Sequence, residues 1–143
     1  MELEYIKQLQ NSLGEPMGEH MAGFGAWLNG RVVAVSDEGD MVMQFTVREN
    51  MLNPMGNMHG GAIAAVMDEI LGFQIFLKSE KGAAYVSMTM NIDFLAAAKP
   101  GDVITATPKV MRIGRKTANV TCLLTNEAGK LIAQGTSNFM RVI

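Results

Sequence analysis

The sequence of 143 residues is poor in the residue types that build disulfides and metal sites. It holds one cysteine, Cys122, and only two histidines, His20 and His59. A single cysteine excludes an internal disulfide, and this set of Cys and His residues argues against a structural zinc site. We therefore expect no metal.

Positive charge is also scarce, because 12 Lys and Arg residues stand against 14 Asp and Glu residues, for a net charge of −2. Nucleic acid is not expected as the main partner, since phosphate binding requires a cationic surface. The first residues lack the cationic start and apolar run of a signal peptide. No segment is expected to reach the ~18 apolar residues that a membrane span needs. We therefore expect a soluble cytoplasmic protein without a membrane partner.

Apolar residues are abundant: 48% of the chain is hydrophobic, 18% is charged, and 13 residues are methionine. This composition predicts a globular protein, and the length suits one domain of roughly 100–200 residues. We expect an N-terminal helix and loop over residues 1–24 and the main body of the domain over residues 25–143. The methionines indicate either a malleable binding surface or a Met-rich core without functional meaning.

Hydrophobic periodicity predicts two helices and six strands. The expected helices cover 3–13 and 62–77, with a loop over 14–25, and the expected strands cover 32–35, 41–47, 86–94, 103–111, 117–125 and 130–142. The long second helix is apolar nearly all round, so it must be buried on most faces. The fold class is therefore α+β, with one curved antiparallel sheet around a central helix. We expect the last four strands to form a meander.

The strand expected over 86–94 alternates strictly between apolar and polar residues. One face is thus expected to be buried and the other polar or partly exposed; the apolar set is Val86, Met88, Met90, Ile92 and Phe94, and the polar set is Ser87, Thr89, Asn91 and Asp93.

A loop with two glycines leads directly into the long helix. Gly60 and Gly61 stand where the first amides of the helix lack internal partners and where the helix dipole adds partial positive charge. Such a helix start can bind an oxyanion or a polarised carbonyl oxygen. A tight turn without chemistry is the alternative.

Asp68 lies in the middle of this apolar helix, where a carboxylate is rarely found without a function or a partner. Glu69 points about 100° away around the helix, so we expect at most one of the two to face a given cleft. The alternative is that both lie on a solvated stripe. Gly60 and Asp68 are about 12 Å apart along the helix axis and cannot serve one carbonyl in a single chain. If both are catalytic, the site should lie at the interface of a two-fold dimer.

These residues carry a resemblance to a known family. The pattern Asn53-x-x-Gly56-x-x-His59-Gly60-Gly61, followed by Asp68, resembles the signature of hotdog-fold acyl-CoA thioesterases of the phenylacetate-pathway (PaaI-like) type. The segments 86–92 and 125–135 resemble later strands of that family, and the resemblance covers roughly residues 25–142. It implies the hotdog fold, a long helix wrapped by an antiparallel sheet.

The resemblance also implies roles for single residues. The Gly60 amide would bind the thioester carbonyl oxygen, and Asn53 would polarise that carbonyl or orient the loop. His59 would brace the loop or reach the thioester. Asp68 of the other subunit would act as general base on water or as nucleophile, and Ser87 would hold the water. Without the resemblance, Asn53 is a turn residue, Ser87 an outward polar residue and His59 a structural loop residue.

Substrate binding can be assigned on the same basis. Coenzyme A carries phosphates that Arg and Lys side chains can pair with. The expected substrate-binding residues are Gly61, Lys99, Arg112, Gly114, Arg115 and Lys116. A solvated hairpin is the alternative for the basic turn. The acyl pocket is expected to use methionines 51, 55, 58 and 67 together with Leu71 and Phe73.

The leading hypothesis is an acyl-CoA thioesterase that hydrolyses a medium-chain or aromatic acyl-CoA to free acid and coenzyme A. No cofactor is expected, because water is the nucleophile or resolves an anhydride, and coenzyme A belongs to the substrate. The expected assembly is a homodimer, with pairing of dimers into a tetramer. A non-catalytic acyl-CoA-binding or regulatory protein and a hotdog hydratase or dehydratase are the alternatives.

Overall fold

A computed structural model describes all residues from 1 to 143. The helices are α1 (Leu3–Asn11), α2 (Gly23–Leu28) and α3 (Gly60–Lys78), with short 3₁₀ helices at Gly18–His20 and Glu49–Met51. The strands are β1 (Arg31–Val35), β2 (Met41–Thr46), β3 (Tyr85–Phe94), β4 (Val103–Ile113), β5 (Thr117–Thr125) and β6 (Leu131–Arg141). The segment expected to be a loop over 14–25 thus contains a 3₁₀ helix and the start of α2, and the expected boundary after residue 24 falls inside α2.

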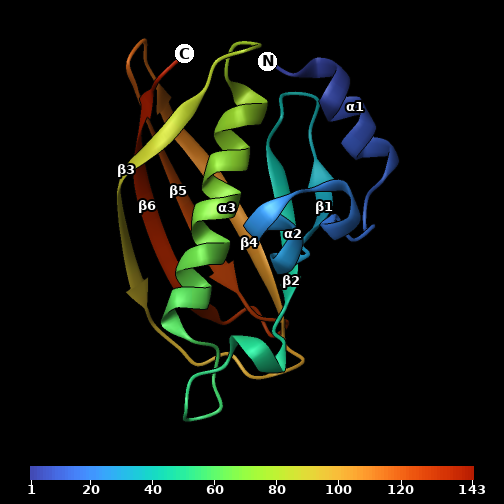
Figure 1. The fold of residues 1–143 in the computed structure, drawn as a ribbon, viewed down its shortest axis with the longest axis vertical. Helices are drawn as coiled ribbons and strands as arrows, with labels where there is room; N and C mark the ends of the chain where they lie inside the picture. Colours follow the sequence, from blue (N-terminus) through green and yellow to red (C-terminus); the bar gives the residue numbers. More distant parts are fainter.

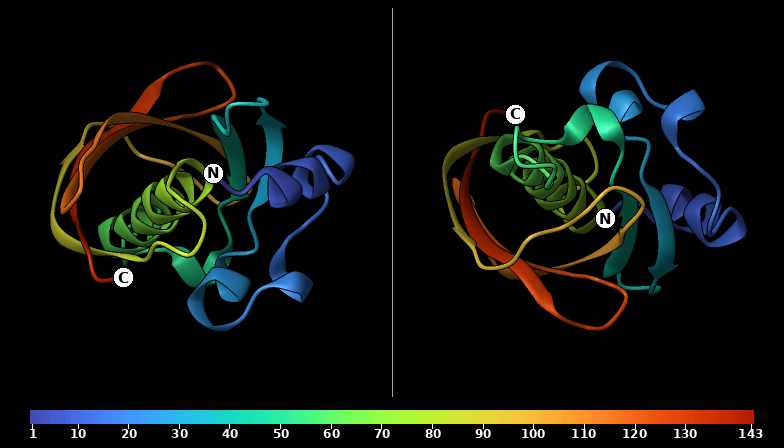
Figure 2. Two further views of the ribbon diagram at one scale, coloured as in Figure 1. Left: turned by 90° about the horizontal axis from the view of Figure 1, so that it is seen from above. Right: turned by 90° about the horizontal axis from the view of Figure 1, so that it is seen from below.

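The six strands form one antiparallel sheet in the order β1-β2-β4-β5-β6-β3. The sheet curves around α3, which lies along its concave side, while α1 and α2 lie near the β1–β2 end (Figures 1 and 2). The predicted α+β class and the hotdog architecture are therefore confirmed.

The prediction of a four-stranded meander is wrong. Strands β4, β5 and β6 do follow one another, but β3 pairs with β6, with Ile92 opposite Gly135, and has no pairing with β4. The chain leaves β3 at one edge of the sheet and enters β4 in its middle. Alternation of apolar residues fixes which face of a strand is buried but not which strand pairs with it. Because an apolar helix must be covered from more than one side, the sheet wraps around α3 and β3 closes its far edge next to β6.

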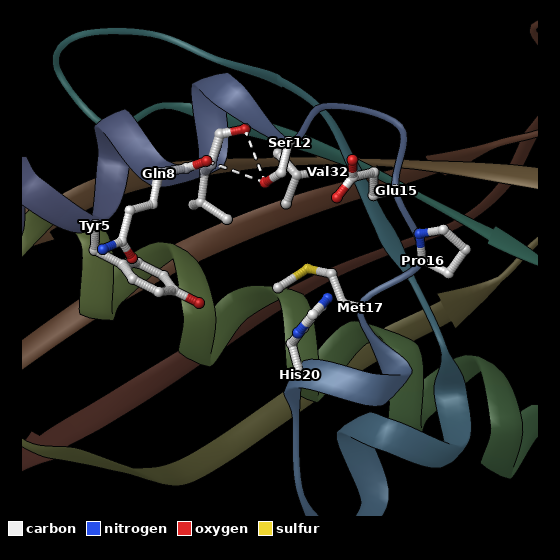
Figure 3. A pocket seen from close by; sticks show the side chains of 9 residues that line it. Tyr5, Gln8, Ser12, Glu15, Pro16, Met17, His20 and Val32 are labelled. Atoms are coloured by element: carbon white, nitrogen blue, oxygen red, sulfur yellow. Dashed lines mark hydrogen bonds between the residues drawn. The ribbon is translucent and has the colours of Figure 1, made fainter.

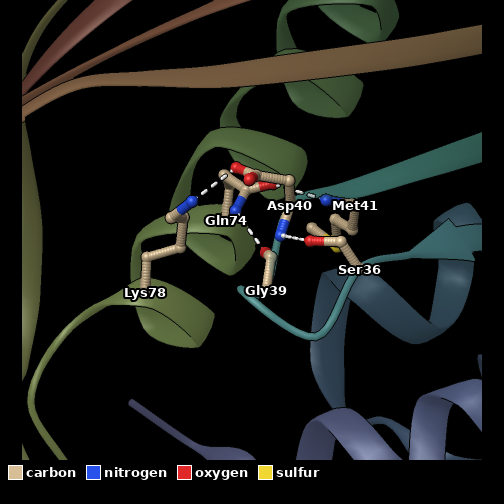
Figure 4. Close-up of polar contacts among 6 residues, drawn as sticks. All are labelled: Ser36, Gly39, Asp40, Met41, Gln74 and Lys78. Carbon is tan, nitrogen blue, oxygen red and sulfur yellow. Dashed lines mark hydrogen bonds and ion pairs between the residues drawn. The ribbon is translucent and has the colours of Figure 1, made fainter.

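The second half of α3 is tied to the β1–β2 hairpin by a fully buried polar side chain. The Met41 amide donates to Gln74 Oε1 at 3.0 Å, and Gln74 Nε2 donates to the Gly39 carbonyl at 2.7 Å. Lys78 forms an ion pair with Asp40 at 2.6 Å on the surface above this contact (Figure 4). Gln74 therefore satisfies two buried backbone groups and fixes the hairpin against the helix.

By length and composition alone, α3 would qualify as a membrane span, contrary to the expectation that no segment would. One such helix is weak support for a membrane protein, because the core helix of a globular domain meets the same criterion. Here α3 buries eight residues within the fold: Ile63, Val66, Met67, Ile70, Leu71, Gln74, Ile75 and Leu77.

Strand β3 is an edge strand with an irregularity at Met88. Its pairing with β6 passes from Ser87 opposite Phe139 to Thr89 opposite Asn138, so Met88 is an extra, bulged residue. The bulge reverses the alternation and turns Ser87 toward α3. The prediction that Val86 and Met88 share a buried face with Met90 is therefore wrong, since they are 47% and 46% exposed. Phe94, predicted on the same buried face, is 56% exposed at the end of the strand.

Candidate active site

A cleft runs along the side of α3 that the sheet leaves open. Its floor consists of small residues and two carboxylates, namely Gly61, Ala64, Ala65, Asp68, Glu69 and Gly72. Strand β3 forms one wall with Ser87 to Met90, and the segment that contains α2 forms the other. Small side chains on the floor leave the backbone of α3 open to a ligand.

Asp68 and Ser87 meet across this cleft. Ser87 Oγ donates a hydrogen bond of 2.9 Å to Asp68 Oδ1, and the Asp68 side chain is exposed. The contact depends on the bulge at Met88, because regular alternation would turn Ser87 to the convex face of the sheet. A carboxylate with a hydroxyl beside it can orient a water molecule and accept its proton.

Glu69 lines part of the same cleft as Asp68, which contradicts the expectation that only one of them would face it. The Glu69 carboxyl group packs where Gly25 has no side chain, since a Cβ built on Gly25 would clash with the Glu69 carboxylate. Burial, and then the charge of Asp68, raise the pKa of Glu69. Asp68 and Glu69 therefore both line this part of the cleft.

At the start of α3, one of the two glycine amides is used and the other is free. The Gly61 N–H donates to Nδ1 of His59 at 2.8 Å, so His59 caps the helix with its ring. This bond places the ring proton on Nε2. The Gly60 N–H has no partner within the chain. Only Gly60 can therefore offer a helix-terminal amide to a carbonyl oxygen.

Asn53 organises the loop before the helix. Its Oδ1 accepts from the Met55 amide at 3.0 Å and from the Asn57 amide at 3.1 Å. The Asn53 amide in turn donates to the Asn57 carbonyl at 2.7 Å, which closes the loop. The side-chain oxygen thus orients the loop, and the side-chain NH₂ group remains as a donor.

The single chain does not bring Gly60 and Asp68 together. Both lie on the continuous helix α3, eight residues apart in sequence, which corresponds to about 12 Å along the axis. Gly60 lies next to Phe94, whose ring would be 3.4 Å from a Cβ built on Gly60, whereas Asp68 lies next to Ser87. The two groups therefore flank opposite ends of β3.

The expected coenzyme A ligands also lie beside opposite ends of β3. Lys99 follows Ala98, whose carbonyl accepts from the Met58 amide in the loop before Gly60. The basic turn, residues 112–116, lies beside the start of β3, because the Lys116 carbonyl accepts from Arg141 next to Tyr85. Arg112 donates to Thr117 Oγ1 at 2.8 Å and covers Gly114, while Arg115 and Lys116 are exposed.

A family model described as the thioesterase superfamily matches residues 55–133. The chain belongs to the thioesterase superfamily. Human acyl-coenzyme A thioesterase 13 is 39% identical over 108 residues, which cover 74% of this chain and 76% of the human protein. Acyl-coenzyme A thioesterase PaaI of Escherichia coli K12 is 32% identical over 97 residues, which cover 68% of this chain and 67% of PaaI. The expected PaaI-like hotdog thioesterase is thus confirmed, and the protein is a thioester hydrolase.

Solved structures share the fold of this thioesterase. Zebrafish thioesterase superfamily member 2 superposes with a TM-score of 0.80 at 36% identity and covers 98% of both chains. A hypothetical thioesterase from Streptococcus pneumoniae TIGR4, solved with coenzyme A, has a TM-score of 0.73 at 26% identity and covers 80% of this chain and 86% of its own.

Several residues expected in the acyl pocket of this thioesterase lie elsewhere. Met67 and Leu71 are fully buried in the core, Met58 is 5% exposed, and Met55 is 81% exposed on the loop. Of that set, only Met51 and Phe73 line the clefts beside α3. Six of the 13 methionines lie in the core, namely Met17, Met41, Met43, Met51, Met58 and Met67.

Sequence reasoning missed Phe24 and Trp27, which line the clefts from α2. Their spacing of three residues puts both on one side of a helical turn and could have revealed them. The glycines around them, Gly23 and Gly25, concealed that turn by favouring a loop.

A separate pocket of about 390 Å³ lies between α1 and the segment that follows it (Figure 3). Tyr5, Gln8, Glu15, Met17 and His20 are among its lining residues, and none of its lining residues takes part in the α3 clefts of the thioesterase. No group of three His, Cys, Asp or Glu side chains is placed to hold a metal ion.

Proposed function

We propose that the chain is an acyl-CoA thioesterase that acts as a homodimer and hydrolyses medium-chain or aromatic acyl-CoA to the free acid and coenzyme A. One observation carries this proposal. Helix α3 presents both a free Gly60 N–H and the Asp68 carboxylate, which accepts a hydrogen bond from Ser87. The names of the human and Escherichia coli relatives support acyl-CoA as the substrate class.

The unpaired edge of β3 is the support for the dimer. An exposed edge strand with apolar side chains, here Val86 and Met88, is prone to pair with another strand. A two-fold axis perpendicular to the sheet near the middle of β3 would pair this strand with an antiparallel copy of itself and bring the Ser87 end of one strand beside the Phe94 end of the other. Since Asp68 contacts Ser87 and Gly60 lies beside Phe94, the same axis brings Asp68 toward Gly60 of the partner subunit. Two equivalent sites result.

The reaction then divides between the two chains. The Gly60 N–H of one chain binds the thioester carbonyl oxygen and stabilises the oxyanion as it forms. Asp68 of the other chain takes a proton from a water held by Ser87, and the water oxygen bonds to the carbonyl carbon. The tetrahedral intermediate collapses with cleavage of the C–S bond, and the proton passes to the coenzyme A sulfur. Attack by Asp68 itself, with hydrolysis of the anhydride, uses the same groups.

Coenzyme A recognition follows from the same axis. It places Lys99 of one chain at the end of the dimer where the partner has its basic turn, residues 112–116. The bound coenzyme A of the pneumococcal relative supports a coenzyme A site in this fold. Cationic side chains from two chains would pair with the phosphates of one ligand.

Exposed apolar residues on the convex face of the sheet support pairing of two dimers. Leu123 and Met140 are 48% and 44% exposed there. A light-scattering mass of four chains would support the tetramer, and a mass of two chains would restrict the assembly to the dimer.

The shared site can be tested by complementation between two inactive chains. Gly60→Pro removes the N–H and adds the proline ring, which is tolerated at the first position of a helix, and the extended His59 backbone suits a residue before proline. Gly60→Ala is the matched control, since its Cβ meets Phe94 at an ordinary contact distance and its N–H remains. We expect Gly60→Pro to lose about 10²–10³-fold in kcat and Gly60→Ala to keep most of the activity.

Mixed dimers of Gly60→Pro and Asp68→Asn chains contain one intact site, so they should recover up to half of the wild-type activity. The readout is acid formation, by mass spectrometry, across a panel of acyl-CoA lengths. Absence of recovery in verified mixed dimers would disprove the shared site. Acyl-CoA binding by the wild type without turnover would instead favour a regulatory binding protein.

A further inference from the structure

The pocket between α1 and the segment that follows it has an apolar floor. Its volume of about 390 Å³ falls in the range of pockets that hold small organic ligands, roughly 300–1,000 Å³. Leu9 of α1, Met17 and Val32 of β1 line it and are all buried. A ligand with an apolar body would displace water from this floor, which favours binding.

Four polar side chains stand around the floor without a partner. Tyr5, Gln8, Glu15 and His20 line the pocket, and none of these side chains forms a hydrogen bond or an ion pair within the chain. The Tyr5 hydroxyl, the Glu15 carboxylate and the His20 ring are directed into the pocket from different sides (Figure 3). Burial raises the pKa of Tyr5, so its hydroxyl stays a donor at neutral pH. A few convergent polar groups above an apolar floor are typical of a ligand site.

Backbone hydrogen bonds fix the wall of the pocket opposite α1. The Gly14 N–H donates to the Val32 carbonyl at 2.8 Å, and the Met17 N–H donates to the Gly30 carbonyl at 2.9 Å. The His20 N–H in turn donates to the Met17 carbonyl at 2.9 Å. These bonds hold the wall in place before a ligand arrives, which lowers the entropy lost on binding.

The charges around the pocket favour a cation. Glu15 is the only carboxylate in its lining, and no Lys or Arg lines it. The first 20 residues contain four glutamates and one lysine, so the surrounding field is also negative. An ammonium group beside Glu15 gains an ion pair, and the Gln8 side-chain oxygen is a second acceptor for its N–H groups.

We propose that this pocket is a second ligand site, which binds a small organic amine. The ammonium group pairs with Glu15, and the apolar body of the ligand packs on Leu9, Met17 and Val32. The site is independent of the proposed thioesterase mechanism, because none of its lining residues lines the clefts beside α3.

The test uses two probes of the same shape, tryptamine and tryptophol, which share an indole ring and an ethyl linker. Tryptamine carries an ammonium group at pH 7 where tryptophol carries a neutral hydroxyl. With ¹³C-labelled methionine methyl groups, NMR reports on the pocket through Met17 and on the catalytic cleft through Met51. At low ionic strength we expect tryptamine to shift the Met17 signal with a Kd of about a millimolar and tryptophol to bind about two- to fivefold more weakly.

Three variants locate the contacts. Glu15→Gln keeps the size of the side chain and removes its charge, so it should raise the Kd of tryptamine about two- to fivefold and leave that of tryptophol nearly unchanged. Glu19→Gln is the matched control, because it removes the same charge from an exposed residue outside the lining. Gln8→Trp puts a large ring at the exposed rim without a change in the core, and should abolish binding of both probes. All three should keep the hydrolytic activity of the wild type.

Each outcome decides the proposal. Saturable movement of the Met17 signal, a preference for tryptamine that Glu15→Gln removes and Glu19→Gln keeps, and loss of both probes in Gln8→Trp support it. Equal Kd values for the two probes in the wild type would overturn the assignment of an amine. A Met17 signal that does not move, or a Met51 signal that moves at lower probe concentration, would overturn the site itself.

Discussion

The two halves of α3 differ in what their polar groups do. In the second half, Gln74 is completely buried, and both ends of its side chain are bonded to the β1–β2 hairpin. In the first half, the Gly60 N–H has no partner, and Asp68 is exposed with one hydroxyl beside it. One helix thus combines a fully satisfied anchor with groups left free for a ligand, and the anchor holds the free groups in position.

The largest effect should come from Asp68, in the open half. Asp68→Asn keeps an acceptor for Ser87 but removes the base, so kcat should fall by about 10²–10⁴-fold. Because the side chain is exposed, Tm should stay within a few °C of wild type. Steady-state kinetics and calorimetry on the same protein check both statements. Wild-type turnover in this variant would remove Asp68 from the mechanism.

Gln74 should show the reverse pattern. Gln74→Leu leaves the Met41 N–H and the Gly39 carbonyl without partners in the core, which should cost about 2–4 kcal/mol of unfolding free energy in a denaturant titration. The KM of the remaining folded enzyme should hardly change. Lys78→Ala is the control, since its surface ion pair with Asp40 contributes less than about 1 kcal/mol. Equal losses in the two variants would contradict the contrast between buried and surface contacts.

Glu69 lies between the two halves and should give a smaller, pH-dependent effect. Burial and the charge of Asp68 raise its pKa in the folded state above the ordinary 4.5, so the folded protein holds this proton more tightly than the unfolded chain. Stability from this group is therefore present at low pH and is lost as pH rises from 4.5 through the raised pKa. Glu69→Gln should raise Tm at pH 7 by a few °C at most and flatten Tm against pH in that range. A lower Tm at pH 7 would contradict this assignment.

The contrast between the halves also shows what the sequence could predict. The apolar helix, the strands and the loop with His59, Gly60 and Gly61 followed from periodicity and turn residues, because these are local properties. The place of β3 at the edge beside β6 did not follow, since pairing is a property of the whole sheet. The direction of Ser87 depended on one bulged residue that leaves no mark in the alternation.

The candidate site divides in the same way. Gly60 and Asp68 stood out in sequence because a glycine pair before a helix and a carboxylate among apolar residues are both unusual. The buried Gln74 and the aromatic wall of Phe24 and Trp27 did not, because their roles come from neighbours distant in sequence. Gln74 also looks like an ordinary polar position on a helix until its two backbone partners are known.

The smallest effect concerns Cys122, on the concave face of β5 in the core. Burial raises the pKa of its thiol to about 12, so almost no thiolate forms at pH 8, and a disulfide reagent should label the native enzyme only when it opens. The labelling rate then reports local opening of the core. Gln74→Leu should label faster than wild type and Asp68→Asn at the wild-type rate, because only the former loosens the packing around α3. Equal rates in all three proteins would show that Gln74 does not control opening of the sheet from the helix. Rapid labelling of the native wild type would show that Cys122 is accessible.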